Sequence, residues 1–424
     1  MRRYEKTKAG STKKVDGSPR SSGELERQNL DQLARQGALR MLKDVLEQEV
    51  SEFLGRNRYQ RTEDFNGYRN GYGKKRKVAV GSGTLEFRAP RVRTTLEPYE
   101  SQVLGRYQRQ SNSVKELIPE LYLHGLATGD FELALRGLLG EGASLSAASV
   151  ARLKQKWEGE YETWRKRSLA DHRYVYLWCD GIYPKAGVVG DKMALLVVLG
   201  LNENGQKEPL AILEGYRESS ESWSSVLRDL KERGLTDPRL FIGDGALGLW
   251  AAIREVYPKA DWQRCWCHKM RNVISCYPKR LRGEVAIRLR EMYNASTRDQ
   301  ALALMDNFAK RYQAEYPRAV ECLLKDRDVL LSYFDYPAAH WQSIKTTNPI
   351  ESIFSPVRLR TNAARRIKSV RSALYLIFQL ITRAQQRWRS INAPEMVQKV
   401  IEGYKFKDGI EIKVGRKKRE KAAA

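Results

Sequence analysis

Strand and helix patterns alternate between residues 173 and 267, and this alternation constrains the fold more than any other feature of the chain. RYVYLWCDGIY, MALLVVLGL and EPLAILEGY each have the pattern of a strand, and the Asn-Gly turn between the second and the third favours a hairpin. A helical pattern, the strand PRLFIGDGA, a second helical pattern and the short strand DWQRCWC follow. The order β-β-β-α-β-α-β predicts an α/β fold with a central mixed sheet, whose first three strands form an antiparallel meander.

Residues 279–335 interrupt the alternation with helical patterns alone, which predicts an all-helical insertion. After it, RSALYLIFQLITRAQQRW predicts one more amphipathic helix. At 424 residues the chain is too long for one simple core. We predict these regions in chain order: a disordered basic tail (1–23), a nucleic-acid-binding region with a helix and a basic β-hairpin (24–110), a helical region of helix-turn-helix type (111–172), the first part of the α/β core (173–278), the insertion (279–340), the second part of the core (341–404) and a basic tail (405–424).

The formal net charge of +25 indicates nucleic acid or an anionic membrane surface as a partner. The longest apolar run, residues 193–201, has about half of the ~20 residues that a membrane span needs. The first ten residues, MRRYEKTKAG, lack the apolar segment of a signal peptide. Five cysteines in a chain of this length do not make a disulfide framework, which favours a reducing, intracellular setting. These patterns favour nucleic acid over a membrane.

Residues 66–93 combine a hairpin pattern with strong positive charge. The runs KKRKVAV and TLEFRAP flank GSG, and the whole stretch has eight Lys or Arg and one acid. Three rings, Tyr68, Tyr72 and Phe87, lie among the charges, an arrangement that suits a phosphate backbone. A hairpin with an ordinary solvated face is the alternative. The candidate DNA-binding residues here are Arg69, Lys74, Lys75, Arg76, Lys77, Arg88, Arg91 and Arg93.

Residues 113–157 have the pattern of a helix-turn-helix. SVKELIPELYLHGL and GDFELALRGLLG precede a glycine-containing turn, and Ser146 is a good N-cap for a last helix, SAASVARLKQKW. That helix would present side chains to a major groove. Three successive helices are also common in proteins that never bind DNA, so this pattern alone decides little. The candidate contact residues are Ser149, Arg152, Lys154 and Lys156.

Two aspartates close predicted strands, and each precedes a glycine. Asp180 ends the first strand in LWCDG, and Asp244 ends the fourth in FIGDG. If these strands are neighbours, the two carboxylates are adjacent and repel each other. This repulsion raises the pKa of one of the aspartates unless a divalent cation neutralises the charge. Mg²⁺ binds one or two carboxylates together with waters and substrate phosphates. An Asp-Gly turn is the structural alternative for each residue taken alone.

Glu351, in NPIESIFSPVRLRT, has two interpretations. With Asn348 as the N-cap and Pro349 at the first helical position, it would reach back to the cap amide in a capping box. Alternatively, it faces the two aspartates from a helix packed beside the sheet. Arg358 lies seven residues further on the same face, where it could hold a phosphate.

Four motifs in this chain together resemble the Mutator-type transposases, and in particular their bacterial insertion-sequence branch. They are DGIY, GDGALGLW, RCWCHKMRNV, and TTNPIES with VRLRT. NGYRNGYGKK, APRVR and QQRWRSINAP extend the resemblance over about residues 24–405.

The resemblance implies a ribonuclease H-like domain with a DDE triad, which falls on Asp180, Asp244 and Glu351 as ligands of two Mg²⁺ or Mn²⁺ ions. It also implies binding of double-stranded DNA at terminal inverted repeats and in the target, a homodimer or higher oligomer, and a bacterial cytoplasmic, nucleoid-associated location. The family has a Cys/Asp-x-x-His signature after the second acid, matched here by Cys265 and His268. The family resemblance therefore predicts metal-dependent cleavage and strand transfer of DNA.

The sequence CWCH could also supply three zinc ligands, Cys265, Cys267 and His268. A structural zinc site needs a fourth ligand, and the remaining cysteines show no second pair. A hydrogen-bonding or packing role beside the active site is the favoured interpretation, with His268 near the scissile phosphate as the bolder one.

Pro356 departs from the family pattern, in which this stretch usually reads ESTFATVRLRT. A proline inside a helix costs about 3 kcal/mol and predicts a kink between Glu351 and Arg358. A catalytically silent DNA-binding regulator derived from a transposase is the alternative function. Pro356 favours it weakly, whereas the three intact acids argue against it.

Overall fold

The computed structural model describes residues 22–62, 66–95, 97–123, 147–183, 193–216, 218–363 and 369–412, together with Leu135 and Leu139. The chain divides into two compact units. The first is Met1–Glu120 with Thr128–Ser146, and the second is Leu121–Ala127 with Ala147–Ala424. The predicted basic tail 1–23 lies almost entirely outside the described residues. Residues 147–172 belong to the second unit. The sequence pattern predicted instead a separate helical region over residues 111–172.

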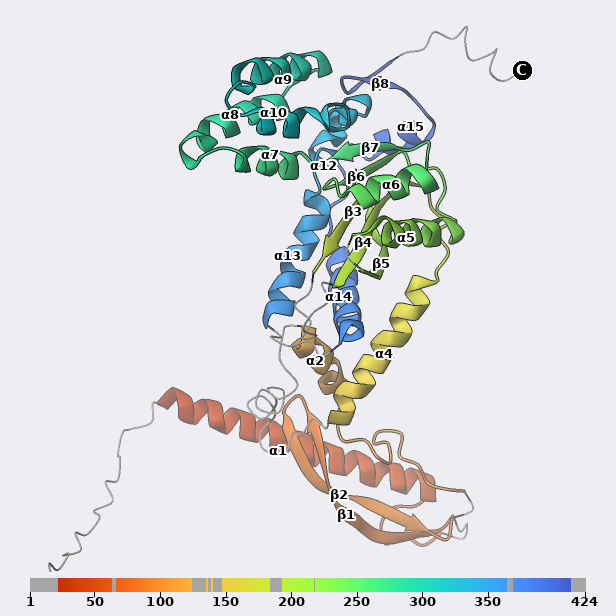
Figure 1. Cartoon of the computed structure of the whole chain (residues 1–424). Helices are drawn as coiled ribbons and strands as arrows, with labels where there is room; N and C mark the ends of the chain where they lie inside the picture. The colour runs from red at the N-terminus through yellow and green to blue at the C-terminus, as the bar shows by residue number, and fades with distance from the viewer. Residues whose placement is uncertain are drawn as a thin grey trace, which may run out of the picture. The chain divides into compact units, whose positions relative to one another are not determined.

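The first unit pairs a long helix with a β-hairpin (Figure 1). Helix α1 is Ser22–Leu54, and strands β1 (Tyr68–Val80) and β2 (Gly83–Arg93) form an antiparallel pair, so the predicted hairpin is confirmed. Helix α2 (Asn112–Leu123) follows. The core of this unit is a cluster of five buried side chains: Leu46, Val78, Leu85, Phe87 and Leu104. Phe87 is therefore a core residue and is not one of the rings available to DNA.

The second unit is built on a mixed five-stranded sheet in the order β5-β4-β3-β6-β7. Its strands are β3 (Tyr174–Ile182), β4 (Met193–Asn202), β5 (Lys207–Tyr216), β6 (Leu240–Gly243) and β7 (Asp261–Arg264). Strands β3, β4 and β5 form the predicted antiparallel meander, and β6 and β7 extend it in parallel with β3. The predicted succession of strands along the chain and the mixed sheet are confirmed.

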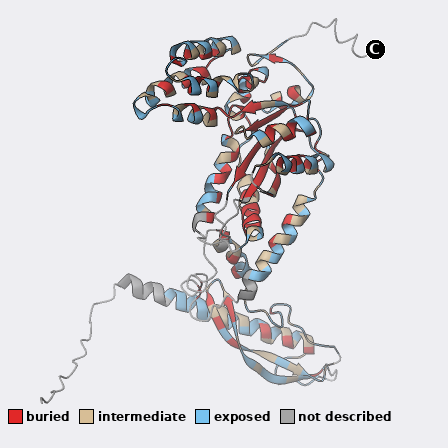
Figure 2. Cartoon of the chain, in the orientation of Figure 1, coloured by how far each residue is buried: buried red, intermediate tan, exposed pale blue. Residues whose placement is uncertain are grey.

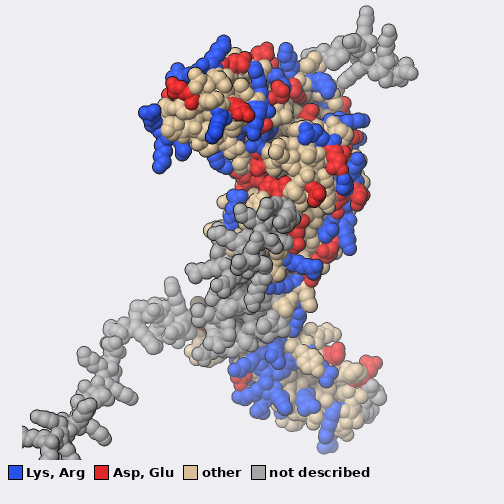
Figure 3. Space-filling view, in the orientation of Figure 1, with Lys and Arg blue, Asp and Glu red and all other residues tan. Residues whose placement is uncertain are grey.

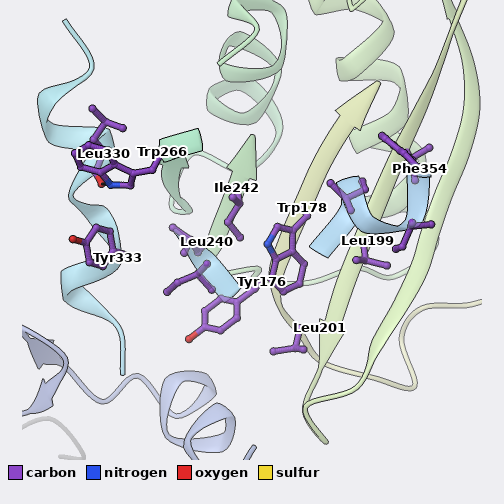
Figure 4. Packing of buried hydrophobic residues seen from close by; sticks show 14 of the residues in the cluster. Tyr176, Trp178, Leu199, Leu201, Leu240, Ile242, Trp266, Leu330, Tyr333 and Phe354 are labelled. Carbon is purple, nitrogen blue, oxygen red and sulfur yellow. Dashed lines mark hydrogen bonds between the residues drawn. The ribbon is translucent and has the colours of Figure 1, made fainter. Parts of the chain in front are cut away.

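Helices cover both faces of the sheet (Figure 1). Helices α5 (Ser220–Glu232) and α6 (Leu247–Val256) pack on one face, where Leu177 and Phe241 point. Helices α4 (Ala147–Arg165), α13 (Asn348–Ala363) and α14 (Val370–Gln385) pack on the other, where Trp178 and Ile242 point. Every residue of β3 is buried (Figure 2), because alternate side chains enter the two cores. Figure 4 shows Tyr176 and Trp178 from this strand beside Leu240 and Ile242.

The segment between β7 and α13 is helical, as predicted for residues 279–335. Its elements are α7 (Trp266–Ser275), η1 (Lys279–Leu281), α8 (Arg282–Tyr293), α9 (Arg298–Tyr312), α10 (Pro317–Leu324), α11 (Arg327–Leu330), η2 (Ser332–Asp335), η3 (Ala338–His340) and α12 (Trp341–Ile344). Buried Lys345 donates to the Tyr293 carbonyl at 2.9 Å and lies over the rings of Tyr293, Tyr333 and Trp341. This contact ties the helical segment to the chain that enters α13.

The C-terminal part after α15 (Glu395–Ile401) differs from the predicted tail 405–424. Phe406–Lys407 (β8) and Ile410–Glu411 (β9) form a short hairpin. Gly409 exchanges backbone hydrogen bonds with Phe334 and Ala338, so the hairpin is held by contacts distant in sequence rather than by its own pattern. The described helices include none that is long and apolar enough to cross a membrane.

Candidate active site

Two aspartates end neighbouring strands of the sheet. In the parallel pair β3–β6, Cys179 is opposite Gly243. Asp180 and Asp244 are the next residues of these strands, so both acids lie at the same edge of the sheet. The first and fourth strands are neighbours, so the condition for adjacent aspartates is met.

Asp180 has a buried carboxyl group, and no Lys or Arg of the described residues forms an ion pair with it. Its side chain is 9% exposed, and Oδ1 accepts a hydrogen bond of 2.8 Å from the Gly181 amide. Burial raises the pKa of Asp180, and the charges of Asp244 and Glu218 raise it further, to about 7. The Gly181 amide and His268 oppose this shift without cancelling it. The predicted mutual repulsion of the two aspartates is therefore present in the folded chain.

Asp244 sits on a tight turn that only glycine can complete. Its Oδ1 accepts a hydrogen bond of 3.0 Å from the Ala246 amide, and Gly245 between them has a φ of +89°. A Cβ on Gly245 would lie 1.1 Å from Nη1 of Arg264. Arg264 is 6% exposed, and its Nε lies 3.4 Å from Oδ2 of Asp326. A buried guanidinium thus supports the turn that carries Asp244.

Glu218 is a third acid at this edge, and the sequence analysis missed it. It follows β5 by two residues, and its carboxylate accepts a hydrogen bond of 2.9 Å from the Tyr183 hydroxyl. Burial and the charge of Asp244 raise the pKa of Glu218. A signal was available, because β5 is parallel to β3 in the meander and therefore ends at the same sheet edge. Figure 3 shows Asp and Glu side chains gathered over the start of α13.

Cys265, His268 and Thr347 form a hydrogen-bonded cluster beside Glu351. Sγ of Cys265 accepts from the Thr347 amide at 3.3 Å and from its hydroxyl at 3.2 Å. Hydrogen bonds from Cys267, His268 and Thr347 lower the pKa of the Cys265 thiol, despite its burial. The bond to Cys265 in turn raises the pKa of His268. These opposite pKa shifts favour the negative form of Cys265 and the positive form of His268 relative to the free side chains.

Glu351 lies in the first turn of α13, where Thr347 takes the capping position expected for Asn348. The Glu351 amide donates to the Thr347 carbonyl at 2.9 Å. Oε1 of Glu351 lies 3.1 Å from the Thr347 hydroxyl and 3.4 Å from Nε2 of His268. The Thr347 amide binds the sulfur of Cys265, so the capping-box contact to the carboxylate is replaced. The carboxylate of Glu351 instead contacts the Thr347 hydroxyl and His268.

The described residues contain no group of three Asp, Glu, His or Cys side chains arranged to hold a single metal ion. The structure groups Asp180 with Asp244, and Glu351 with His268. His268 connects the two groups, because the charges of Glu351 and Asp244 both raise its pKa. The three predicted acids therefore share one region of the second unit, although they do not surround a single point.

Arg358 is exposed further along α13, and its guanidinium lies 5.7 Å from the ring centre of Phe354. Within the described chain, no contact joins it to the aspartates. Helix α13 continues through Pro356, whose side chain is exposed, so the proline does not end the helix. The predicted kink remains a prediction.

The basic hairpin of the first unit has an exposed, positively charged face. Lys75 is paired with Arg88 across the ladder, and Glu86 lies 2.9 Å from Lys75 and 3.8 Å from Lys77. Like charges directly opposite each other are unfavourable, so this face is suited to a bound anion. Figure 3 shows Lys and Arg prevailing on the visible face of this unit. The exposed candidates are Lys74, Lys75, Lys77, Arg88, Arg91 and Arg93.

Two other candidates on the hairpin are bound within the unit. Arg69 pairs with Glu47 at 2.8 Å and donates to the Ser51 hydroxyl at 2.7 Å. Arg76 donates to backbone carbonyls at 3.0 and 3.1 Å. Both guanidinium groups therefore have structural partners in the folded chain.

The candidates on α4 are only partly described. Arg152 and Lys156 are exposed and Lys154 is half-buried, whereas the side chain of Ser149 lies outside the described residues. The middle helix predicted for the helix-turn-helix also lies almost wholly outside them. Further along α4, the Tyr161 hydroxyl donates to the Ile212 carbonyl of β5 at 2.8 Å. The later part of this helix is thus part of the cover of the sheet.

Comparison with known proteins gives the family. The model of the Mutator family of transposases matches residues 11–391. The transposase for insertion sequence element IS6120 of Mycolicibacterium smegmatis is 46% identical over 296 residues, which cover 70% of this chain and 92% of that one. The transposase for IST2 of Acidithiobacillus ferrooxidans is 43% identical over 286 residues, covering 65% and 94%. The chain therefore belongs to the Mutator family of transposases, as its motifs predict.

Among solved structures, the Drosophila P element transposase strand transfer complex aligns with 68% of this chain and 91% of its own, at 10% identity and a TM-score of 0.23. A likeness at that level carries no argument about the fold. The family assignment rests on the sequence comparisons.

Proposed function

We propose that the chain is the transposase of a bacterial insertion sequence, and that it cuts and joins DNA with a DDE triad on a ribonuclease H-like domain. The observation that carries the proposal is the pairing of Cys179 with Gly243, which sets Asp180 and Asp244 side by side at one sheet edge. An antiparallel meander followed by two parallel strands supports the ribonuclease H-like assignment. Glu351 on α13 completes the triad in this proposal.

The residues suit two Mg²⁺ or Mn²⁺ ions by their chemistry. Burial and then the charge of Asp244 raise the pKa of Asp180, which forms no ion pair with Lys or Arg among the described residues. Oxygen donors of this kind are preferred by hard divalent cations. We assign Asp180, Asp244 and Glu351 as the residues that would hold the ions. When bound, the ions would activate water or a DNA 3′-hydroxyl for in-line attack and stabilise the leaving oxygen.

The side chains around the acids have supporting roles in this proposal. The hydrogen bond with Cys265 raises the pKa of His268, and a ring N–H of His268, near both acid groups, can donate to a phosphate oxygen. Cys265 fixes the start of α13 by accepting from the Thr347 amide. Arg358, exposed two turns beyond Glu351, would bind a flanking phosphate.

Binding of the element's ends is assigned to the basic hairpin and to the exposed cations of α4. Exposed Lys and Arg neutralise phosphates without reading the sequence, and they position the duplex for cleavage. Terminal inverted repeats and target DNA are the proposed partners. Two ends have to be joined in one event, so we propose a homodimer or higher oligomer, working on DNA in the bacterial nucleoid.

The test is cleavage of DNA that carries the element's ends, in Mg²⁺ or Mn²⁺, by Asp180→Ala, Asp244→Ala and Glu351→Ala. Each variant should bind the ends normally and lose about 1,000-fold or more in cleavage, since the ions supply several kcal/mol to the transition state. Glu291→Ala, an exposed acid on α8, is the control and should cleave like the wild type. Cleavage that survives in one of the three would remove that residue from the triad. Specific end binding without cleavage by the wild type would favour a catalytically silent regulator.

A further inference from the structure

Asp326 joins two buried cations at the boundary between the helical segment and the sheet, and the proposed chemistry does not use it. Its Oδ2 lies 3.4 Å from Nε of Arg264 and 2.5 Å from Nζ of Lys269. Arg264 is 6% exposed and Lys269 is 1% exposed. Arg264 is the last residue of β7, and Lys269 lies in α7. One carboxylate oxygen of the helical segment thus contacts cations from two other elements.

Capping of its own helix does not explain the placement of Asp326. The residue is the N-cap of α11, where an aspartate usually accepts a hydrogen bond from a backbone amide of the first turn. The side chain of Asp326 makes no such hydrogen bond. Its carboxylate is directed to Arg264 and Lys269 instead, so the contact with two cations replaces the local contact that this residue type favours.

Docking of the helical segment does not require this ionic contact either. The Leu330 carbonyl accepts from the Trp266 indole at 2.8 Å and from the Gln263 side chain at 3.0 Å. The Tyr333 amide donates to Oε1 of Gln263 at 2.9 Å. Figure 4 shows Trp266 beside Leu330. These uncharged contacts already join the segment to β7 and α7, whereas buried ion pairs add little net stability because desolvation offsets their attraction.

The guanidinium of Arg264 lies against the turn that carries Asp244. Arg264 is opposite Gly243 in the parallel pair β6–β7. A Cβ on Gly245 would lie 1.1 Å from Nη1, 1.9 Å from Cζ and 2.5 Å from Nε of Arg264, so the group lies directly on the Gly245 backbone. Within the described chain, the buried Nε and Nη1 have no hydrogen-bond partner. The ion pair with Asp326 is therefore the described polar contact that holds this guanidinium in place.

We propose that Asp326 and Arg264 are positioning residues of the active site: Asp326 holds the Arg264 guanidinium against the turn after β6, and the guanidinium fixes the direction of the Asp244 carboxylate. Lys269 keeps the Asp326 carboxylate in place from the other side. The inference rests on the proposed role of Asp244 in DNA cleavage and extends it to the helical segment. Cleavage by the α/β core then depends on this segment through one buried ionic contact.

The experiment measures single-turnover cleavage of end DNA by the full-length chain in Mn²⁺, as the maximal rate and the DNA concentration that gives half of it. Asp326→Asn keeps the shape of the side chain and removes its charge, and Arg264→Met keeps an unbranched stem without the guanidinium. Each should lower the maximal rate about 10- to 100-fold and change the half-maximal DNA concentration less than about 2-fold. Asp326→Glu keeps the charge and should retain more of the rate than Asp326→Asn.

A double variant tests whether the two residues act through one contact. If Asp326 acts through Arg264, adding Asp326→Asn to Arg264→Met should lower the rate no further, whereas independent roles would multiply the two losses. Asp326→Asn leaves two buried cations without their anion, so urea unfolding is used to choose conditions in which each variant is folded. Arg264→Met leaves Lys269 paired with Asp326 and should stay folded, so it decides the result if Asp326→Asn does not fold.

The matched control is Asp328→Asn, an exposed acid two residues further along the chain, which should cleave like the wild type. Wild-type rates in folded Arg264→Met or Asp326→Asn, with no cleavage by Asp244→Ala, would overturn this inference and leave the triad intact. A loss that appears mainly as weaker DNA binding, or multiplied losses in the double variant, would overturn it as well. Cleavage by Asp244→Ala at the wild-type rate would instead overturn the assigned role of Asp244, and the positioning role with it.

Discussion

The strand-end acids and the basic hairpin both concentrate like charges, but they place them differently. Asp180, Asp244 and Glu218, here called the acid cluster, are buried or half-buried and have His268 as the cation acting on them. In the hairpin, Lys75 and Arg88 face each other in solvent, and Glu86 is the one acid of residues 66–93. Each region thus has several charges of one sign and a single counter-charge.

Burial decides what each region can bind. In the acid cluster, the low dielectric constant of the buried site strengthens the repulsion between carboxylates. A small divalent ion that binds at short range neutralises this charge effectively. On the exposed hairpin, water and salt weaken each pair, and a ligand must offer many charges in a row to bind well. The difference predicts strong, pH-dependent effects of single substitutions in the acid cluster and weak, salt-dependent effects on the hairpin.

The largest expected effect is on the pH dependence of stability in Asp180→Asn. The pKa of Asp180 is about 7 in the folded chain against 3.8 unfolded, so the folded state retains the proton longer. The wild type should therefore lose stability as the pH rises from about 4 to 7, by at most roughly 4 kcal/mol. Asp180→Asn should lack this loss and exceed the wild type above pH 7, as measured by urea unfolding without divalent ions.

The control for that experiment is Asp299→Asn, an exposed acid on α9, which should follow the wild-type pH profile. Adding Mn²⁺ should reduce the loss in the wild type and leave Asp180→Asn unchanged. Parallel profiles for the wild type and Asp180→Asn would mean that the acid cluster is not a buried, repulsive site, and the contrast with the hairpin would fail.

Gly245→Ala should give the next largest effect, because it strains the turn under Asp244. The residue would carry a side chain at a φ of +89° and would overlap the Arg264 guanidinium. We expect a loss of ~3 kcal/mol in the free energy of unfolding. Gly283→Ala is the control, since a Cβ there meets nothing within 4 Å on α8, and it should be neutral or slightly stabilising. A neutral Gly245→Ala would show that Arg264 does not hold the turn.

Cys265→Ala tests the part of the site in which Glu351 and His268 pair a negative with a positive group. It removes the acceptor of the buried Thr347 amide and the anion beside His268, so a loss of ~2 kcal/mol is expected. Cys265→Asp keeps an anionic acceptor and should retain more of the stability and of the cleavage activity. If Cys265→Ala and Cys265→Asp lose equal stability in urea unfolding, the sulfur acts only by packing.

The main features of the fold could be predicted because the patterns that set them are local. Alternating apolar strands with an Asn-Gly turn specify the meander, and short strand–helix–strand connections specify parallel β6 and β7. The adjacency of Asp180 and Asp244 follows from that topology, since strand ends at one edge bring their last residues together. The sequence therefore indicates part of the site.

The remaining features depend on contacts that no local pattern contains. Thr347 becomes the cap of α13 because Cys265, 82 residues earlier, accepts from its amide. Phe87 is buried with Leu85 on the hairpin face that packs against Leu46 of α1, a contact between segments distant in sequence. Glu218 follows from the same edge rule as the aspartates, but it lies beyond the last apolar residue of β5, where no strand pattern remains to indicate its place.

The smallest expected effects come from the hairpin, where charge acts in solvent. Lys75→Ala should weaken binding of any duplex a few-fold and reduce the dependence of log K on log salt by about 0.9, the share of one phosphate contact. Glu86→Gln should act in the opposite direction, because it removes the counter-charge 2.9 Å from Lys75. Arg69→Ala should instead lower stability, since its guanidinium already binds Glu47 and Ser51. Equal salt slopes for Lys75→Ala and the wild type would show that DNA binds another face. Of the two regions compared, the excess charge would then serve ligand binding in the acid cluster alone.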